Sequence, residues 1–220
     1  ADDIMLLAPT VTALQIMLVA CELELKSIGM QINVQKSACM RFGYRYDSPC
    51  SSIISLSGNT LKWVTSFKYL GIVIVSGKRF RCLFDACKQK FFGSFNAIFG
   101  RVGRFASEEV ILHLIRTKCL PVLLYAIEAC PLLSRDIHSF EFVINRCLMK
   151  LFKTSSIVIV NECCDFFGFT PIRLTIETRT VKFLERYISS ENIVCSCFAR
   201  FATAQLNGLR RASAADMPVL

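Results

Sequence analysis

Two adjacent aspartates, Asp2 and Asp3, are the residues of this sequence whose types best suit catalysis. They stand directly before an apolar run at residues 4–7, and two carboxylates beside a buried strand are electrostatically costly unless a cation neutralises them. Carboxylate oxygens are ligands that suit Mg²⁺, and two-metal phosphoryl transfer uses such ligands to hold its ions about 3.5–4 Å apart. An Asp-Asp pair alone is more often an ordinary polar turn, so the metal interpretation needs support from other segments.

Basic residues gather in a second region, residues 76–120. This stretch contains nine Lys and Arg against three Asp and Glu, which accounts for six of the nine net positive charges of the chain. Clustered positive charge is typical of proteins that bind a polyanion, although a solvated helix face has the same composition. The phenylalanines between residues 80 and 99 have helical spacing, which favours an apolar core stripe beside a basic face over base-stacking side chains.

The elements that must position these residues begin with a small sheet and one helix. Residues 4–7 are expected to form a buried strand, and Thr12 with Gln15 has the pattern of a capping box that starts a helix ending at Gly29. Beyond Gly29 the apolar period changes to two, which predicts five strands. They are expected near residues 30–34, 38–43, 52–56, 60–64 and 67–75.

The rest of the chain is predicted to be helical. Apolar residues at helical spacing, interrupted by Gly103, Ser107, Pro121 and Pro171, indicate six helices after Gly77. They are expected near residues 79–101, 107–118, 121–133, 136–153, 171–188 and 191–206. A sheet region followed by a helical region defines the α+β class, with the boundary near residues 76–78.

Length and composition restrict the class of protein. The 220 residues are 53% hydrophobic, which allows a buried core and argues against disorder. The most apolar segment, residues 119–133, is shorter than the about 20 residues that span a bilayer and contains two prolines. Residues 1–10 lack the basic start of a signal peptide. We therefore expect an intracellular protein, in the nucleus or cytoplasm, that is neither secreted nor transmembrane.

The twelve cysteines are expected to be reduced and buried. Cys163-Cys164 and the pair Cys195 and Cys197 lack the two-residue gap usual between zinc ligands, and the sequence has only two histidines. Free cysteines are common in protein cores, and intracellular proteins rarely form disulfides. This pattern favours core thiols over a metal site.

Four segments, taken in order, resemble a known family. Residues 1–8 read Ala-Asp-Asp-Ile-Met-Leu-Leu-Ala, residues 29–37 read Gly-Met-Gln-Ile-Asn-Val-Gln-Lys-Ser, and residues 66–71 read Ser-Phe-Lys-Tyr-Leu-Gly. They resemble motifs C, D and E of reverse transcriptases and look closest to those of non-LTR (LINE-type) retrotransposons. Residues 119–129 resemble a helix common in the thumb region of those elements. The resemblance spans most of residues 1–185.

The resemblance implies a fold and a division into domains. Residues 1–76 would be the C-terminal part of a polymerase palm, a small antiparallel sheet with one helix. Residues 77–155 would form an all-helical thumb, and residues 156–220 a helical C-terminal extension. Motif C would begin just before Ala1, so the fingers, motif B and motif A, with its own catalytic aspartate, are expected in an upstream part of the same polypeptide.

The resemblance also implies roles at the reaction centre. Asp2 would be the principal ligand shared by two Mg²⁺ ions in the complete enzyme, and Asp3 the more peripheral ligand. Lys36 matches a motif D lysine that is proposed to protonate the departing pyrophosphate. A cation suits that task because negative charge develops on the leaving oxygens. A surface lysine after a strand is the alternative interpretation of Lys36.

Further residues would contact nucleic acid. One group matches the primer grip, which holds the primer terminus: Phe67, Lys68, Tyr69, Leu70 and Gly71. Phe67 and Leu70 are more simply explained as strand core, whereas Lys68 and Tyr69 can meet a phosphate or a sugar. A second group would contact the phosphate backbone of the template–primer duplex: Lys88, Lys90, Arg101 and Arg104.

The function implied is that of an RNA-directed DNA polymerase, which extends a primer 3′-end by two-metal nucleotidyl transfer. Its partners would be an RNA template, a DNA primer and deoxynucleoside triphosphates, without a membrane. The chain by itself is expected to be inactive, because it contains only part of the metal site. Two alternatives remain open: a non-catalytic nucleic-acid-binding relic or domesticated domain, and a helical interaction module with no role in nucleic-acid binding.

Overall fold

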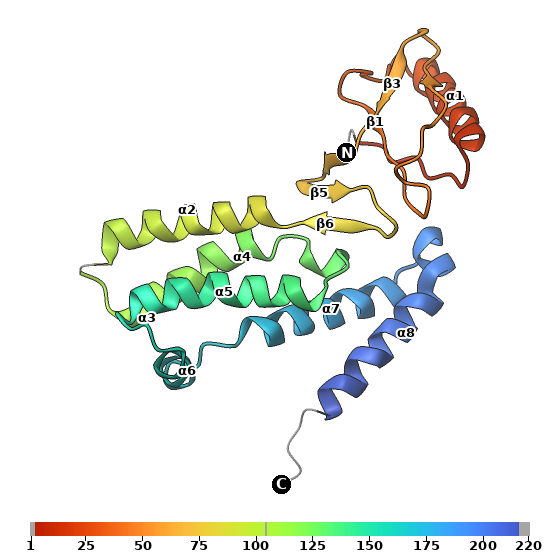
Figure 1. Cartoon of the computed structure of the whole chain (residues 1–220). Helices are drawn as coiled ribbons and strands as arrows, with labels where there is room; N and C mark the ends of the chain where they lie inside the picture. Colours follow the sequence, from red (N-terminus) through yellow and green to blue (C-terminus); the bar gives the residue numbers. More distant parts are fainter. Residues whose placement is uncertain (1–2, 104, 216–220) are drawn as a thin grey trace. The chain divides into compact units, whose positions relative to one another are not determined.

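The chain folds into two units that differ in secondary structure. A computed structural model describes residues 3–103 and 105–215, and it divides into Ala1–Leu83 and Phe84–Leu220 (Figure 1). Both small sheets lie in the first unit, and 57% of the chain is helical, so the fold is mixed α+β. The division follows Leu83, whereas the sequence placed it near residues 76–78, because residues 81–83 belong to a strand.

The first unit begins with an irregular segment instead of the buried strand predicted at residues 4–7. None of the described strands pairs with this segment, and a strand without a partner leaves its backbone groups unsatisfied. Ile4, Met5 and Leu7 are exposed, Leu7 to 75%. Only Leu6 packs against the core of the unit. The prediction was wrong because apolarity alone does not supply a pairing strand.

Helix α1 (Val11–Ser27) begins earlier than the capping pattern predicted. Its N-cap residue is Thr10, whose side-chain oxygen accepts a hydrogen bond from the Ala13 N–H (3.1 Å). Gln15 instead uses its side-chain amide to donate to the Ile54 carbonyl (2.7 Å) and to accept from the Ile54 N–H (2.8 Å). The predicted end at Gly29 is confirmed, since Gly29 has a φ of 74°, which glycine adopts without strain.

The first sheet is mixed, not antiparallel throughout. It contains β1 (Ala38–Cys39), β2 (Ile53–Ile54) and β3 (Thr60–Trp63) in the order β1-β3-β2, and β1 runs parallel to β3. Residues 30–34, predicted as a strand, are irregular and lead into a turn. Helix α1 covers this sheet through a core of buried and half-buried apolar residues. The buried members are Leu18, Cys39, Ile53 and Leu61.

The second sheet is an antiparallel meander of β4 (Ser66–Tyr69), β5 (Ile72–Val75) and β6 (Arg81–Leu83). Residues 67–75 were predicted as one strand, but they turn back at Leu70-Gly71 and form a hairpin. Residues 79–83 were predicted as the start of a helix, but β6 pairs with β5. Tertiary pairing therefore overrides local helical spacing at this point.

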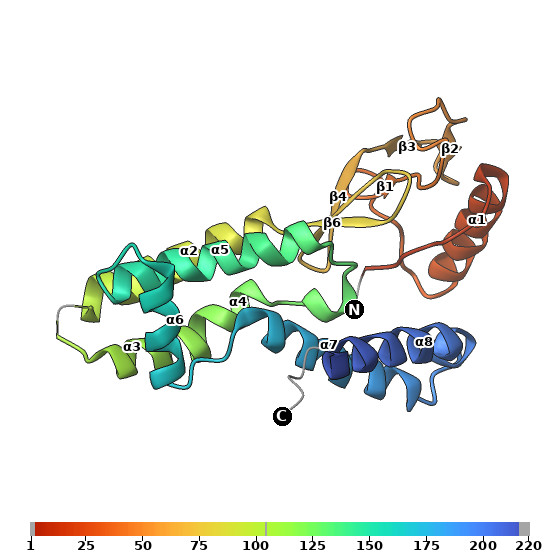
Figure 2. The same cartoon turned by 60° about the horizontal axis from the view of Figure 1, so that its bottom comes forward.

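The second unit is helical throughout. Its helices are α2 (Asp85–Val102), α3 (Glu108–Leu114), α4 (Leu120–Leu123), α5 (Ser134–Leu151), α6 (Ile157–Phe166), α7 (Ile172–Ile188) and α8 (Ile193–Ala215). A π-helical turn η1 (Ile115–Cys119) joins α3 to α4, and a 3₁₀ turn η2 (Ile127–Ala129) follows α4. The predicted helix at 121–133 is thus broken, and α6 was not predicted. Helices α2 and α5 lie side by side, and α7 and α8 form a hairpin (Figures 1 and 2).

The core of the second unit is built around large apolar side chains. Phe91 and Phe95 of α2 and Phe140 of α5 are each at most 1% exposed, and Phe84 meets Phe140 edge-to-face at 5.3 Å between ring centroids. One segment among the described residues, Glu108–Ala129, has the length and mean hydropathy (1.7) of a membrane-spanning helix. Its buried apolar residues, among them Ile111, Ile115 and Leu123, belong to the core of the unit, whereas Val110 and Tyr125 are exposed.

Candidate functional site

The candidate metal ligands lie at the edge of the described chain. Asp2 lies outside the described residues, and Asp3 is exposed in the irregular segment that Leu6 anchors to the core. Within the described residues, no three His, Cys, Asp or Glu side chains are close enough to hold a metal ion. Asp2 and Asp3 are therefore candidate ligands on the strength of the motif resemblance.

Lys36 occupies a tight turn between α1 and β1. Its backbone N–H donates to both the side-chain and the carbonyl oxygen of Asn33, each at 3.1 Å, and the Ser37 N–H donates to the same carbonyl at 2.9 Å. The turn holds the backbone while the Lys36 side chain is exposed. No ion pair of the described chain involves Lys36, so its ammonium is available to an anion.

The predicted primer-grip residues form one hairpin. In β4, Phe67 and Tyr69 are half-buried and Lys68 is exposed, which is the alternation expected of a strand with one covered face. Leu70 and Gly71 form a two-residue turn with φ values of 45° and 85°, the conformation typical of hairpin turns whose twist matches the strands. Leu70 is 54% exposed, so its interpretation as strand core is wrong.

A leucine at positive φ is itself unusual. Branched and bulky residues disfavour this region, and residues held there cost of order 1–3 kcal/mol and cluster at functional sites. The sequence does not predict this, because hairpin turns of this kind normally carry Asn-Gly or Asp-Gly. The hairpin therefore presents an exposed apolar side chain at its tip, with Lys68 beside it on the exposed face.

Four residues were predicted to contact the phosphate backbone of nucleic acid, and one of them, Lys88, instead contacts other residues of this protein. Its ammonium lies 2.8 Å from the Asp85 carboxylate and donates to the Ser139 hydroxyl at 3.0 Å, and its side chain is only 20% exposed. It therefore ties α2 to α5, a role that sequence spacing does not reveal. Lys90 and Arg101 are exposed and have no ion pair among the described residues, and Arg104 lies outside those residues.

The exposed face of α2 combines these two cations with small residues. Gly93 and Gly100 lie between Lys90 and Arg101, and a Cβ atom added at either glycine would meet nothing within 4 Å. The exposed residue Ala97 lies between the two glycines. A helix face without protruding side chains lets a partner approach the helix closely, and the two flanking cations would favour an anionic partner.

The segment at residues 119–129 is a packed structural element. Ala126 has a φ of 53° and breaks the helix between α4 and η2. The Glu128 carboxylate accepts two hydrogen bonds from the Arg179 guanidinium (3.1 and 3.2 Å), which ties η2 to α7. Tyr125 is 55% exposed. Glu128 therefore has a structural role, since its carboxylate joins two packed elements.

The prediction that the cysteines are buried is correct for only four of them: Cys39, Cys82, Cys119 and Cys147 are buried, seven are half-buried and Cys197 is exposed. Burial, and to a lesser degree the neighbouring Cys119, raises the pKa of Cys147 to about 12, and burial also raises the pKa of the Cys39 and Cys119 thiols. A raised pKa keeps a thiol protonated, and a protonated thiol is neither a nucleophile nor a metal ligand.

Two small cavities lie away from the predicted residues. One of about 350 Å³ is lined by residues of α3, η1, α6 and the turn after it, and one of about 230 Å³ lies between α1 and the β2–β3 loop. No predicted site residue lines either of them. Comparison with protein-family models, with curated proteins and with solved structures found no match to this chain.

Proposed function

We propose that this chain is the C-terminal palm and thumb region of a retrotransposon reverse transcriptase, an RNA-directed DNA polymerase. The observation that carries the proposal is the order of four segments, at residues 1–8, 29–37, 66–71 and 119–129. Each segment alone is a weak signal, but their order and spacing agree with one enzyme family. The residues assigned to the reaction centre are Asp2, Asp3 and Lys36, and Mg²⁺ would be held by the two aspartates.

The arrangement of the first unit supports this proposal. A carboxylate segment, a helix, a lysine turn and a hairpin follow one another, as motifs C, D and E require. Asp3 and Lys36 are both exposed, and neither has an ion pair among the residues that the structure describes. The Leu70-Gly71 turn gives the hairpin a fixed tip, which suits an element that positions a primer terminus.

The second unit supports a thumb role through charge and shape. Helix α2 buries Phe91 and Phe95 and exposes Lys90 and Arg101, with the small residues Gly93, Ala97 and Gly100 between them. Such a face can lie close to a duplex and contact its phosphates without reading sequence. In this proposal the thumb begins at Phe84, where the second unit begins, instead of at residue 77, and it ends at residue 155, with residues 156–220 as its extension.

We expect the isolated 220-residue chain to show no primer extension. Two-metal catalysis needs ligands that position both ions, and the family takes one of those ligands from motif A, which this sequence does not contain. The measurement is extension of a DNA primer on an RNA template with Mg²⁺ and deoxynucleoside triphosphates. Robust extension by this chain would overturn the domain assignment.

We expect the chain to bind an RNA–DNA hybrid through Lys90 and Arg101. Replacing both by Ala should weaken binding and make its salt dependence shallower, because each lost phosphate contact removes about 0.9 from the log–log slope on B-form DNA. The same sign is expected on the hybrid. Fluorescence anisotropy across a salt series measures both quantities.

The matched control is the pair Lys182→Ala and Arg211→Ala, which removes one lysine and one arginine that are exposed on α7 and α8. Both double variants lose the same charge, so a difference in binding between them must come from a local contact made by Lys90 or Arg101. Equal binding and equal slopes in the two variants would show that Lys90 and Arg101 are merely solvated.

A further inference from the structure

Two segments of the first unit, far apart in sequence, are joined side by side. The Gly43 N–H donates to the Gly77 carbonyl at 3.0 Å, and Phe42 pairs with Gly77 in an isolated parallel bridge. The Phe42 and Phe80 rings lie 5.5 Å apart between centroids, tilted by 46°. The segments 41–46 and 77–81 therefore form one continuous surface.

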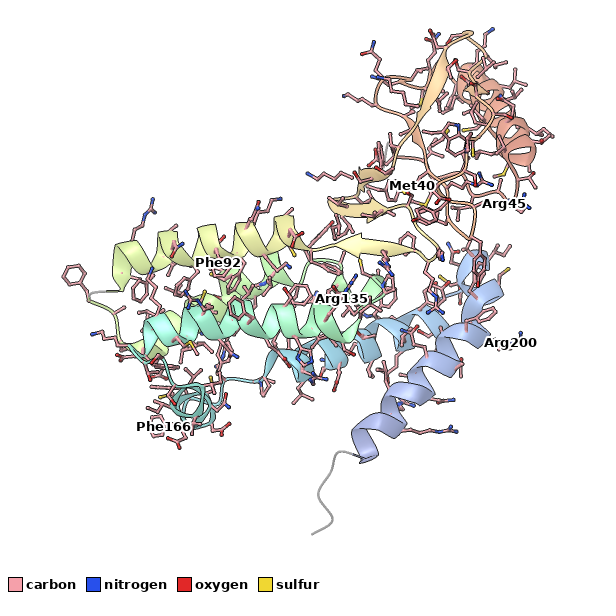
Figure 3. All side chains as sticks on the ribbon, viewed as in Figure 1. Met40, Arg45, Phe92, Arg135, Phe166 and Arg200 are labelled. Carbon is pink, nitrogen blue, oxygen red and sulfur yellow. The ribbon has the colours of Figure 1, made fainter. Side chains whose placement is uncertain are left out.

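This aromatic–basic surface exposes rings and cations together. Its aromatic residues are Phe42, Tyr44, Tyr46 and Phe80, and all are exposed, Tyr44 to 87%. Its basic residues are Arg41, Arg45, Lys78, Arg79 and Arg81. Arg45, labelled in Figure 3, is exposed. Within residues 41–47 and 77–81, Asp47 is the single acidic residue, so the surface carries a strong positive charge.

The rings are presented by an ordered turn. Gly43 has a φ of 104° and reverses the chain, after which the Tyr46 N–H donates to the Gly43 carbonyl (3.1 Å) and the Ser48 N–H to the Arg45 carbonyl (3.2 Å). The Arg41 guanidinium ties the turn to its exit by donating to the Ser48 carbonyl (3.3 Å) and Cys50 Sγ (3.0 Å).

Arg41 is thus the cation that holds the turn, and the others face solvent. Arg45, Lys78, Arg79 and Arg81 are exposed and take part in no ion pair of the described chain. These two segments therefore combine positive charge with exposed aromatic rings, a combination typical of a binding surface. The partner that satisfies both features must be anionic and must offer flat apolar faces.

We propose that the aromatic–basic surface binds single-stranded nucleic acid. Bases would stack on Tyr44 and on the Phe42–Phe80 pair, and phosphates would pair with the surrounding cations, with little preference for sequence because every base has a π-face. A duplex keeps its bases stacked on one another and would leave the rings unused. This inference rests on residues that the proposed polymerase site does not use.

The test measures binding of the full chain to a fluorescein-labelled oligothymidylate of about 12 nucleotides. This length lies within the range of known single-strand binding sites. Tyr44→Ala should weaken binding by about 5- to 150-fold, the range found when a stacking side chain is truncated. Tyr44→Phe should restore it, because stacking needs the ring and not the hydroxyl. Phe80→Ala should also weaken binding.

The matched control is Tyr125→Ala, which removes another exposed tyrosine (55%) from the helical unit and should leave binding unchanged. Tyr44 is almost wholly exposed, so its loss should not disturb folding, and an unchanged thermal transition checks this. Binding by Tyr44→Ala and Phe80→Ala equal to that of the parent chain would overturn the proposal, as would no binding by the parent at low salt. The Lys90 and Arg101 double variant should bind the single strand normally. The experiments can therefore contradict the single-strand proposal without contradicting the proposed hybrid-duplex binding, and the reverse.

Discussion

Replacing Asp2 by Asn, in a polypeptide that restores the upstream polymerase segments, should reduce primer extension by several orders of magnitude. In the proposed function Asp2 is the ligand shared by both Mg²⁺ ions. Losing its charge removes several kcal/mol of transition-state stabilisation, and each 1.36 kcal/mol corresponds to about tenfold in rate. Single-turnover extension of a primer on an RNA template measures the effect.

Three companion variants make the result specific. Asp3→Asn should retain more activity than Asp2→Asn, because Asp3 is the peripheral ligand. Lys36→Ala should cost about 10²- to 10⁴-fold, the contribution typical of a general acid. Asp165→Asn, which neutralises an exposed carboxylate on α6, should change nothing. Near-normal extension by the Asp2 variant would show that the metal-site assignment is wrong.

Replacing Phe140 by Ala should destabilise the helical unit by about 3–5 kcal/mol, the loss typical of truncating a buried phenylalanine. The Phe140 side chain is 0% exposed and packs edge-to-face on Phe84, so the substitution leaves a cavity between α2 and α5. A domain is stable by about 5–15 kcal/mol, and the loss is therefore a large part of the total.

The matched control lies on the same helix. Phe142 is 64% exposed, and Phe142→Ala should change the free energy of unfolding by less than about 0.5 kcal/mol. Urea unfolding followed by far-UV circular dichroism reports mainly the helical unit, whereas fluorescence of Trp63, the one tryptophan of the sequence, reports the first unit. Equal midpoints for the Phe140 and Phe142 variants would show that α5 is not packed as described.

Some elements could be predicted from sequence because a single residue determines them locally. The end of α1 is such a case, since Gly29 readily takes a φ of 74°. The start of α1 is not, because Thr10 and Thr12 are both good N-cap residues. The choice depends on Gln15, whose amide is engaged by Ile54, 39 residues further along the chain. No local pattern contains that information.

In the candidate site, too, some features could be predicted from local sequence and others depend on distant contacts. The order of the motif-like segments is a property of the sequence and could be read directly. The turn at Leu70-Gly71 could not, because Leu at positive φ gives no turn signal inside an apolar run. Nor could the role of Lys88, whose hydrogen-bond partner Ser139 is 51 residues away. Contacts between distant segments decide whether a basic residue is free to bind a partner.

The Gln15 amide also has a consequence for how copies of this chain behave toward one another. β2 is the outer strand of its sheet, and an outer strand offers unpaired N–H and C=O groups on which another chain can add a strand. The side chain of Gln15 occupies both groups of Ile54, and the Glu22 carboxylate accepts a hydrogen bond from the next outward group, the Leu56 N–H, at 2.9 Å. Helix α1 thereby closes this edge with side chains in place of a strand, which protects the β2 edge against pairing with a strand of another copy.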